Sequence, residues 1–465
     1  MINFKYENGS FRDPAGTIFY KDKKVFRQIN KSGLERYRHL KESKILEESI
    51  EKKFLIATRE CEDKSLLQSL QEAEIILEHD LIEYVSYPYE WCFYQLKDAA
   101  LLHLNFQLFL LEKNSVLIDS SAYNIQFIGC KPIFIDVLSI DKYKEGMYWT
   151  GHKQFCENFL NPLLLSSKKN INFNNWFKGN LEGILTSDLN SILSFKDKFS
   201  INIFLQVYLL DKLENKAIEN PKKTLGDIKK IKPFVKKSYR SLLLQIKKMI
   251  ERLEPNTRST VWGKYSENNT YSNDNEKIKI NIVKDFINKN KFNLLADIGC
   301  NNGLYSFESL KSGCQNVVGF DYDLNALNNA FLKSKNNKTS FLPLYFDASN
   351  PSANIGWHER ERKGFKERLN FDGMIALAFE HHLAIFKNIP LDQTISWLIN
   401  VAPKGLIEFV PKDDETVQSM LLLKGDIFPN YSEKNFKSLM QNKVNIINVT
   451  EVGTTGRKIY EYEKK

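Results

Sequence analysis

The chain has 465 residues, of which 42% are hydrophobic and 12% aromatic; this is enough for two or three domains and excludes a disordered protein. No apolar run is long enough to cross a bilayer, and the six cysteines are too widely spaced for a disulfide framework, so we expect a cytoplasmic protein without a transmembrane segment. The net charge of +9 comes from scattered lysines, which makes nucleic acid an unfavoured partner that is not excluded.

The first half of the chain predicts an α+β domain. A hairpin is expected at "TIFYKDKKVFRQI", a helix near residues 33–51, strands at "FLIATREC" and "IILEHDLIEYVSYPYEW", and a strongly apolar helix over residues 93–112. We place this domain at residues 1–250, because Pro, Asn, Ser and Thr crowd together in residues 251–277.

One stretch of this half carries polar residues at a suggestive spacing. In "LIDSSAYNIQFIGCKPIFIDVLS", Asp119 is followed five residues later by Asn124, and Asp136 follows the next hairpin. This stretch resembles the core of protein-kinase-like folds, and the resemblance implies a catalytic acid and two ligands for Mg-ATP. The chain departs from that pattern because Arg27 stands where kinases carry a lysine and no glycine-rich loop is recognisable. The alternative is an accessory domain in which Asp119 and Asn124 only cap a turn.

Residues 251–465 alternate between strand and helix patterns. Helices are predicted over residues 277–290 and 303–312, and Asp323 is a plausible N-cap for a third. Strands are predicted at "NLLADIG", "NVVGFDYD", "TSFLPLYFD", "FDGMIALAF" and "GLIEFVP", and a terminal hairpin is expected around "GTTG". This alternation predicts a doubly wound, parallel α/β domain.

Acidic residues close three successive strands of this domain. Asp297 stands before Gly299 and Gly303 in the first strand-to-helix turn, Asp321 ends the second strand, and Asp347 ends the third. A dinucleotide site would show G-x-G-x-x-G, and an acid in the turn would repel a phosphate, so a cationic or neutral nucleoside is the better ligand.

These motifs resemble class I S-adenosylmethionine-dependent methyltransferases with a Rossmann-like seven-stranded sheet. More narrowly, "TVWGKYSENNTYS", "DIGCNNG", "LPLYFDASNPSANIGWHERER", "ALAFEHHLAI" and "IEFVPKDD" resemble the family related to rhizobial host-specificity nodulation proteins. The resemblance implies that S-adenosyl-L-methionine is held by Asp297, Gly299, Cys300, Asn301, Gly303, Asp321, Tyr322, Asp347 and Ala348. It implies no metal in this domain.

The acceptor side of the site is predicted from the remaining strand ends. His381 and His382 follow the fourth strand, where a base with a near-neutral pKa is able to take a proton from a hydroxyl or amine. Glu380 precedes them where family-like sequences carry an aliphatic residue, and we count all three as catalytic candidates. Trp357, Arg360, Arg362 and Glu408 are the candidates for binding the acceptor.

The sequence therefore predicts a methyltransferase that acts on a small-molecule, glycan or lipid-linked acceptor and carries a kinase-like N-terminal module. Three alternatives stay open: an RNA methyltransferase, a bifunctional kinase-methyltransferase, and a regulatory protein that binds nucleotide or S-adenosylmethionine without chemistry.

Overall fold

The computed structural model describes residues 4–70, 72–219, 234–256 and 273–465, so the motif "TVWGKYSENNTYS" lies outside the described residues. The chain divides into two compact units. The first comprises Met1–Phe127, Pro132–Arg258 and Gly356–Arg362, and the second comprises Ile128–Lys131, Ser259–Ile355 and Lys363–Lys465. The predicted second domain was one continuous segment, whereas residues 356–362 fold with the first unit.

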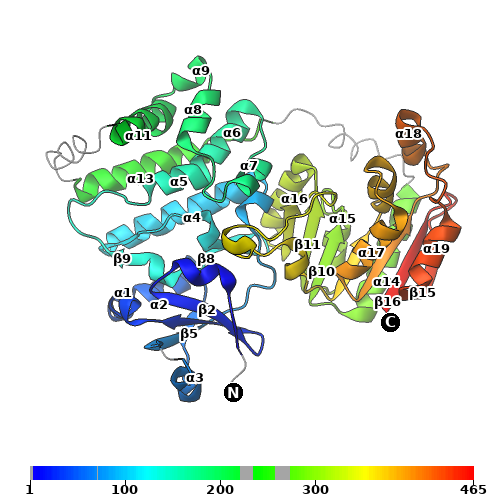
Figure 1. Ribbon diagram of the computed structural model, residues 1–465, viewed down its shortest axis with the longest axis horizontal. Helices are drawn as coiled ribbons and strands as arrows, with labels where there is room; N and C mark the ends of the chain where they lie inside the picture. The colour runs from blue at the N-terminus through cyan, green and yellow to red at the C-terminus, as the bar shows by residue number, and fades with distance from the viewer. Residues whose placement is uncertain (1–3, 71, 220–233, 257–272) are drawn as a thin grey trace. The chain divides into compact units, whose positions relative to one another are not determined.

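The first unit begins with a five-stranded antiparallel sheet of order β1-β2-β3-β5-β4 (Figure 1). Its strands are Lys5–Tyr6, Gly16–Lys21, Lys24–Ile29, Thr58–Glu60 and Ile75–His79 for β1 to β5. The predicted hairpin is confirmed as β2 and β3, whose turn places Asp22 and Lys23 at φ angles of 51° and 60°. A twisted hairpin requires such angles in a two-residue turn.

Two helices, α1 (Lys31–Glu42) and α2 (Ile45–Glu51), replace the one predicted near residues 33–51. Lys44 breaks the helix between them, because its φ of +58° is left-handed. Helix α3 (Lys64–Gln68) helps to cover a small core formed by Phe19, Phe26, Leu66, Leu70 and Ile76.

The buried helix α4 (Phe93–Glu112) matches its prediction and packs against α13 (Lys236–Glu251). In the sequence, α4 is followed by two strand pairs: β6 (Ser115–Leu117) pairs with β9 (Ile140–Lys142), and β7 (Ile125–Ile128) pairs with β8 (Lys131–Phe134). The helices that follow are α5 (His152–Phe155), α6 (Asn161–Lys169), α7 (Asn174–Gly179), α8 (Thr186–Ile192), α9 (Phe195–Lys198), α10 (Ile201–Ile203) and α11 (Leu210–Glu219).

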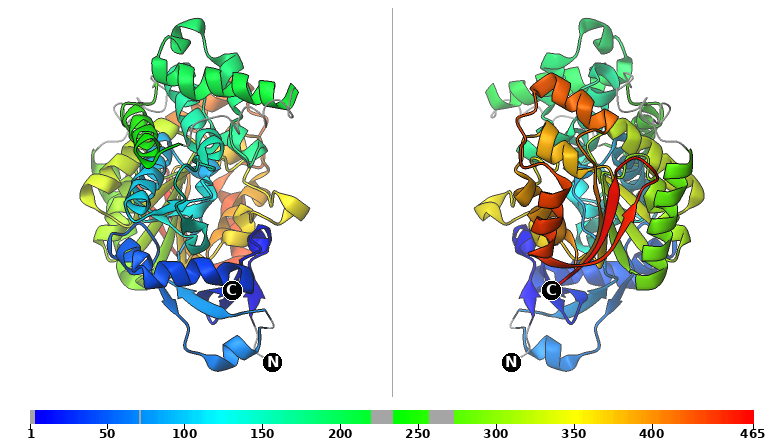
Figure 2. Two further views of the ribbon diagram at one scale, coloured as in Figure 1. Left: turned by 90° about the vertical axis from the view of Figure 1, so that its left-hand side faces the viewer. Right: turned by 90° about the vertical axis from the view of Figure 1, so that its right-hand side faces the viewer.

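The second unit contains a seven-stranded sheet of order β12-β11-β10-β13-β14-β16-β15. Strands β10 (Leu294–Ile298), β11 (Asn316–Asp321), β12 (Phe341–Tyr345), β13 (Gly373–Ala376) and β14 (Lys404–Phe409) are parallel. The predicted terminal hairpin is confirmed as β15 (Val444–Glu451) and β16 (Lys458–Lys464), with β16 antiparallel to β14. Figure 2 (right) shows this hairpin at the edge of the sheet with α19 against it.

In the described part of this unit, six α-helices accompany the sheet: α14 (Asn273–Asn290), α15 (Leu304–Lys311), α16 (Leu324–Asn337), α17 (Leu391–Val401), α18 (Glu415–Lys424) and α19 (Glu433–Gln441). Asp323 caps α16 as predicted, since its carboxylate accepts the backbone N–H groups of Asn325 and Ala326. No helix in the described part of the chain is long and apolar enough to cross a bilayer. The mixed α/β fold agrees with the sequence prediction. The parallel strands bring the predicted acids together where the carboxyl ends of the strands meet, which is the sheet edge referred to below.

Candidate active site

The turn from β10 to α15 is built from a buried acid and left-handed backbone. Asp297 is almost fully buried and accepts a 2.5 Å hydrogen bond from the Ser306 hydroxyl. Burial raises the pKa of Asp297 to about 7, and the Ser306 hydrogen bond opposes that shift. Gly303 has a φ of +83°, and a Cβ there would lie 2.5 Å from the Phe341 ring, so only glycine fits.

Asp321 at the end of β11 holds this turn in place. One carboxylate oxygen accepts the backbone N–H of Asn301 at 2.8 Å, and the other accepts that of Asp323 at 2.8 Å. Burial raises the pKa of Asp321, whereas these two hydrogen bonds lower it. Because each carboxylate oxygen has two lone pairs, Asp321 retains acceptor capacity for a ligand hydroxyl.

The end of β12 lies beside Asp321. The backbone N–H of Phe346 donates to the Asp321 carbonyl at 2.8 Å, which places Asp347 and Ala348 next to the end of β11. Asp347 accepts the backbone N–H and the hydroxyl of Ser349. Tyr322 is 61% exposed, and its ring centroid lies 5.6 Å from that of Tyr345. The predicted cofactor residues therefore lie on three neighbouring strand ends.

The fourth strand end carries the three candidate catalytic residues. The Glu380 carboxylate is fully buried, and its Oε1 accepts the Val410 N–H at 3.0 Å and the Tyr431 hydroxyl at 2.7 Å. Among the described residues, Glu380 Oε2 has no hydrogen-bond partner. Burial raises the pKa of Glu380 to about 8, so this carboxyl is mostly protonated at pH 7.

The two histidines that follow are neutral at pH 7. Their ring centroids are 4.3 Å apart; His381 is buried, and His382 is only partly so. Burial lowers the pKa of His381 well below its ordinary value, and burial together with the charge of Arg457 lowers that of His382 to about 4. Both rings are therefore in the form that accepts a proton, but the expectation of a near-neutral pKa was wrong, because burial makes them weaker bases than free histidine.

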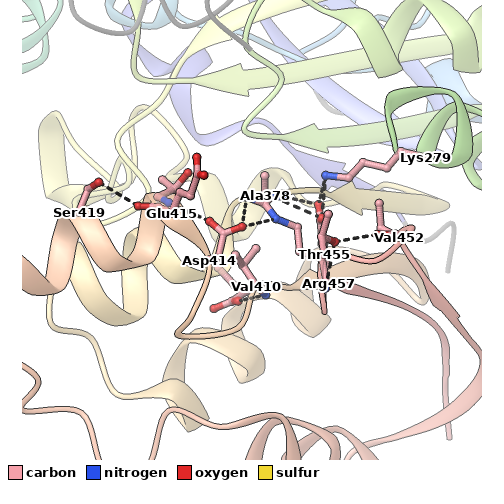
Figure 3. Close-up of polar contacts among 12 residues, drawn as sticks. Lys279, Ala378, Val410, Asp414, Glu415, Ser419, Val452, Thr455 and Arg457 are labelled. Atoms are coloured by element: carbon pink, nitrogen blue, oxygen red, sulfur yellow. Dashed lines mark hydrogen bonds and ion pairs between the residues drawn. The ribbon is translucent and has the colours of Figure 1, made fainter. Parts of the chain in front are cut away.

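Glu408, predicted to contact the acceptor, is instead fully buried in a network of charges. Its carboxylate lies 2.7 Å from Lys279 Nζ and 3.6 Å from an Arg457 guanidinium nitrogen, and it accepts the Ala378 N–H at 2.7 Å. Figure 3 shows Lys279 and Arg457 approaching this network from α14 and from the start of β16. The described contacts give Glu408 a role in holding the protein backbone.

Trp357, Arg360 and Arg362 fold with the first unit. The Arg362 guanidinium lies 4.3 Å from the Tyr123 ring centroid, and Trp357 is 63% exposed. Glu361 between the arginines forms two hydrogen bonds with Arg12, of 2.7 and 3.0 Å. Their predicted contact with the acceptor stays a prediction.

The kinase-like candidates of the first unit do come together. Asn124 Nδ2 donates to Asp119 at 3.0 Å, and Ser139 links Asn124 to Asp136 through its hydroxyl. Arg27 on β3 forms a 3.0 Å ion pair with Asp136. Burial raises the pKa of Asp119.

A curated relative covers almost the whole chain: the nodulation protein NoeA of Rhizobium meliloti is 40% identical over 459 residues, which is 98% of this chain and 95% of NoeA. The chain belongs to the NoeA family. A tRNA U34 carboxymethyltransferase of Campylobacter jejuni is 48% identical over 44 residues, 10% of this NoeA homologue and 15% of the enzyme. No protein-family model matches the chain.

Among solved structures, the N-methyltransferase NodS of Bradyrhizobium japonicum in complex with S-adenosylhomocysteine is 9% identical with a TM-score of 0.32, and the match covers 44% of this chain and 99% of NodS. The strand order of the second unit, with its antiparallel β16 and the acids closing β10 and β11, is that of a class I S-adenosylmethionine-dependent methyltransferase. The second unit of this NoeA homologue therefore has the fold that the sequence resemblance implies.

The sequence prediction missed four residues of this site: Lys279, Asp414, Tyr431 and Arg457. The sequence carries a signal for two of these four residues. Asp414 ends the quoted motif "IEFVPKDD", and Arg457 follows "GTTG" in the predicted hairpin. Lys279 and Tyr431 lie in ordinary helical and loop sequence and carry no such signal.

Proposed function

We propose that the protein transfers the methyl group of S-adenosylmethionine to a hydroxyl or amine of a small-molecule, glycan or lipid-linked acceptor. The observation that carries this proposal is a pair of neutral histidines after β13, at the same sheet edge as Asp297 and Asp321. The cofactor supplies an activated methyl group on a sulfonium, so the protein needs only to align the acceptor and take up its proton.

The residues present fit the cofactor. The β10–α15 turn offers carboxylates, which suit a cationic amino acid and a ribose and would repel a pyrophosphate. We assign Asp297, Gly299, Cys300, Asn301 and Gly303 to the methionine moiety, Asp321 and Tyr322 to the ribose, and Asp347 and Ala348 to the adenine. These assignments carry over what the family resemblance implies for the matching positions.

His382 is the proposed base, because it is the less buried of the two histidines and is held neutral. It takes the proton of the acceptor group as the acceptor forms its bond to the methyl carbon and the carbon–sulfur bond breaks. His381 and Glu380 shape the same turn from within, and the protonated Glu380 carboxyl adds no negative charge there at neutral pH.

Labelled methyl donor tests the reaction directly. Extracts of small molecules, glycans and lipids are incubated with the protein and the donor, and products are sought by mass spectrometry as a +14 Da shift. We expect a labelled product that is lost with His382→Gln, while calorimetry still detects cofactor binding by that variant. Absence of any product from all three extracts would reject the proposed acceptor class.

RNA is a second candidate acceptor, favoured by the 44-residue match to a tRNA-modifying enzyme and by the net charge of +9. The same labelling experiment with total RNA separates the two candidates. Label that disappears after ribonuclease treatment would favour RNA.

For the first unit we propose binding of a nucleoside triphosphate with Mg²⁺. Asp119, Asn124 and Asp136 are linked by hydrogen bonds, and Arg27 supplies a buried cation beside Asp136. Mg-ATP is expected to raise the melting temperature of the protein, and Asp136→Ala is expected to abolish the increase. An increase that survives Asp136→Ala would remove this site, and transfer of phosphate to a substrate would make the protein bifunctional.

A further inference from the structure

Three buried charges and one partly buried charge lie behind the turn that carries the candidate catalytic residues. Lys279 on α14, Glu408 on β14, Asp414 before α18 and Arg457 before β16 are linked by ion pairs, and we call them the clamp network (Figure 3). Lys279, Glu408 and Arg457 are each no more than 3% exposed. The network joins four separate elements around one point of the sheet edge.

The clamp network holds a strained piece of backbone. Ala378 has a φ of +50°, a left-handed angle that is uncommon for a residue with a Cβ. Its N–H donates to Glu408 Oε2 at 2.7 Å, and Lys279 Nζ donates to the same oxygen at 2.8 Å. The acceptor for the strained residue is therefore a carboxylate whose charge is countered by a lysine.

The other side of the turn is fixed by the continuation of the same strand. Val410, two residues beyond Glu408, donates its N–H to Glu380, and Tyr431 contacts both Glu380 and the Val410 carbonyl. Residues 378–380 are thus held at two points by the carboxyl end of β14. His381 and His382 follow directly from this fixed segment.

Stability alone does not account for the clamp network. A buried ion pair contributes little more to folding than apolar residues of similar volume would, because desolvation offsets the attraction. What a carboxylate adds, and an apolar side chain cannot, is an acceptor for the Ala378 N–H.

We propose that Glu408 is a positioning residue for methyl transfer: it fixes the left-handed Ala378 so that His382 meets the acceptor, while Lys279 and Arg457 counter its charge. This inference rests on the proposed methyltransferase function. Arg457 acts on the histidines as well, because its positive charge disfavours a second positive charge on either ring.

The first experiment compares two Glu→Leu variants, because glutamine at position 408 would keep an oxygen that accepts the Ala378 N–H. Glu408→Leu removes this acceptor, whereas Glu461→Leu removes an ion pair of 2.9 Å between Lys289, also on α14, and strand β16. We expect Glu408→Leu to lower kcat at least about tenfold and to leave the Kd for S-adenosylmethionine within about twofold. Glu461→Leu is expected to change neither. An unchanged kcat in a folded Glu408→Leu protein would overturn the proposal.

A second variant separates positioning from stability. Lys279→Met combined with Glu408→Leu removes both charges together, so it is expected to melt close to the wild type while kcat stays reduced at least about tenfold, because the Ala378 N–H still lacks its acceptor. Recovery of kcat together with stability would show that the network is merely structural.

A third measurement works without any acceptor. Side-chain NMR of ¹⁵N-labelled histidines, assigned with His382→Gln, reports the pKa of His382 directly. In Arg457→Met we expect the pKa of His382 to rise by about one pH unit, whereas in the control variant Glu461→Leu we expect it to be unchanged. If the wild-type protein methylates nothing, the proposed function fails; an unmoved His382 pKa would separately overturn the link between the clamp network and the histidines.

Discussion

Replacing Asp321 by asparagine tests the cofactor site at its central contact. Each carboxylate oxygen of Asp321 accepts one backbone N–H at 2.8 Å, from Asn301 and from Asp323. Asparagine keeps the shape but has one acceptor oxygen, so one backbone N–H and one ligand hydroxyl lose their acceptor. Hydrogen bonds to a charged group contribute about 1.5–3 kcal/mol, so a loss of about 2 kcal/mol in binding corresponds to a roughly 30-fold higher Kd for S-adenosylmethionine.

Asp372→Asn is the matched control. Asp372 lies before β13, at the opposite end of the sheet, and its Oδ2 accepts the backbone N–H groups of Asn293 and Leu294 at 3.0 and 2.9 Å. Asp321→Asn is expected to lower stability by about 1–3 kcal/mol, because its two backbone N–H donors use different oxygens. Asp372→Asn should cost less, because both of its donors use the one oxygen that asparagine keeps. Calorimetry at pH 8 is expected to show weaker binding for Asp321→Asn alone, and equal Kd values for the two variants would refute the assignment of Asp321 to the cofactor.

Three further predictions concern neighbouring groups. The affinity for S-adenosylmethionine is expected to rise between pH 6 and 8, because Asp297, with its pKa raised to about 7, attracts a cationic ligand only when ionised; Asp297→Asn should flatten this profile in calorimetry. Burial raises the pKa of Glu380 from its ordinary value of 4.5 to about 8. Between these two pH values the folded chain holds a proton that the unfolded chain has lost, so the free energy of unfolding falls as the pH rises. Denaturant unfolding of Glu380→Gln should therefore lack that part of the slope, and an identical pH dependence would contradict the shift. Gly303→Ala is expected to lower the free energy of unfolding by about 1–3 kcal/mol, more than Gly313→Ala does. Both glycines have a positive φ, but only at Gly303 would the added Cβ clash with a neighbour, the Phe341 ring. Equal melting temperatures of the two variants would contradict this clash.

The architecture of the second unit followed from local patterns. Short apolar runs such as residues 294–298 are bounded by polar turns and predict buried parallel strands, and "GTTG" between two alternating segments predicts a hairpin. Asp323 was recognisable as an N-cap because capping is a contact within one turn of helix. Patterns of this kind hold when the atoms involved are close in sequence.

The role of Glu408 was not predictable in the same way. Its place at a strand end suggested a rim residue open to the acceptor, whereas Lys279, 129 positions away in sequence, buries it completely. Residues 356–362 show the same limit. They follow the third strand in sequence, but Glu361 pairs with Arg12, which lies 349 positions earlier. Such partners depend on tertiary packing, which no local spacing encodes.

The two sides of the sheet edge differ in charge in a way that suits methyl transfer. On the proposed donor side, Asp297 and Asp321 would offer carboxylates to a cationic cofactor. On the acceptor side, the buried Glu380 is mostly protonated at pH 7 and both histidines are neutral, so the turn after β13 carries little charge. A neutral acceptor group entering there meets a base that is able to take its proton, because burial and the positive charge of Arg457 keep that base neutral beforehand. We therefore expect the acceptor atom to be a hydroxyl or neutral amine, since a cationic ammonium has no lone pair with which to attack the methyl carbon.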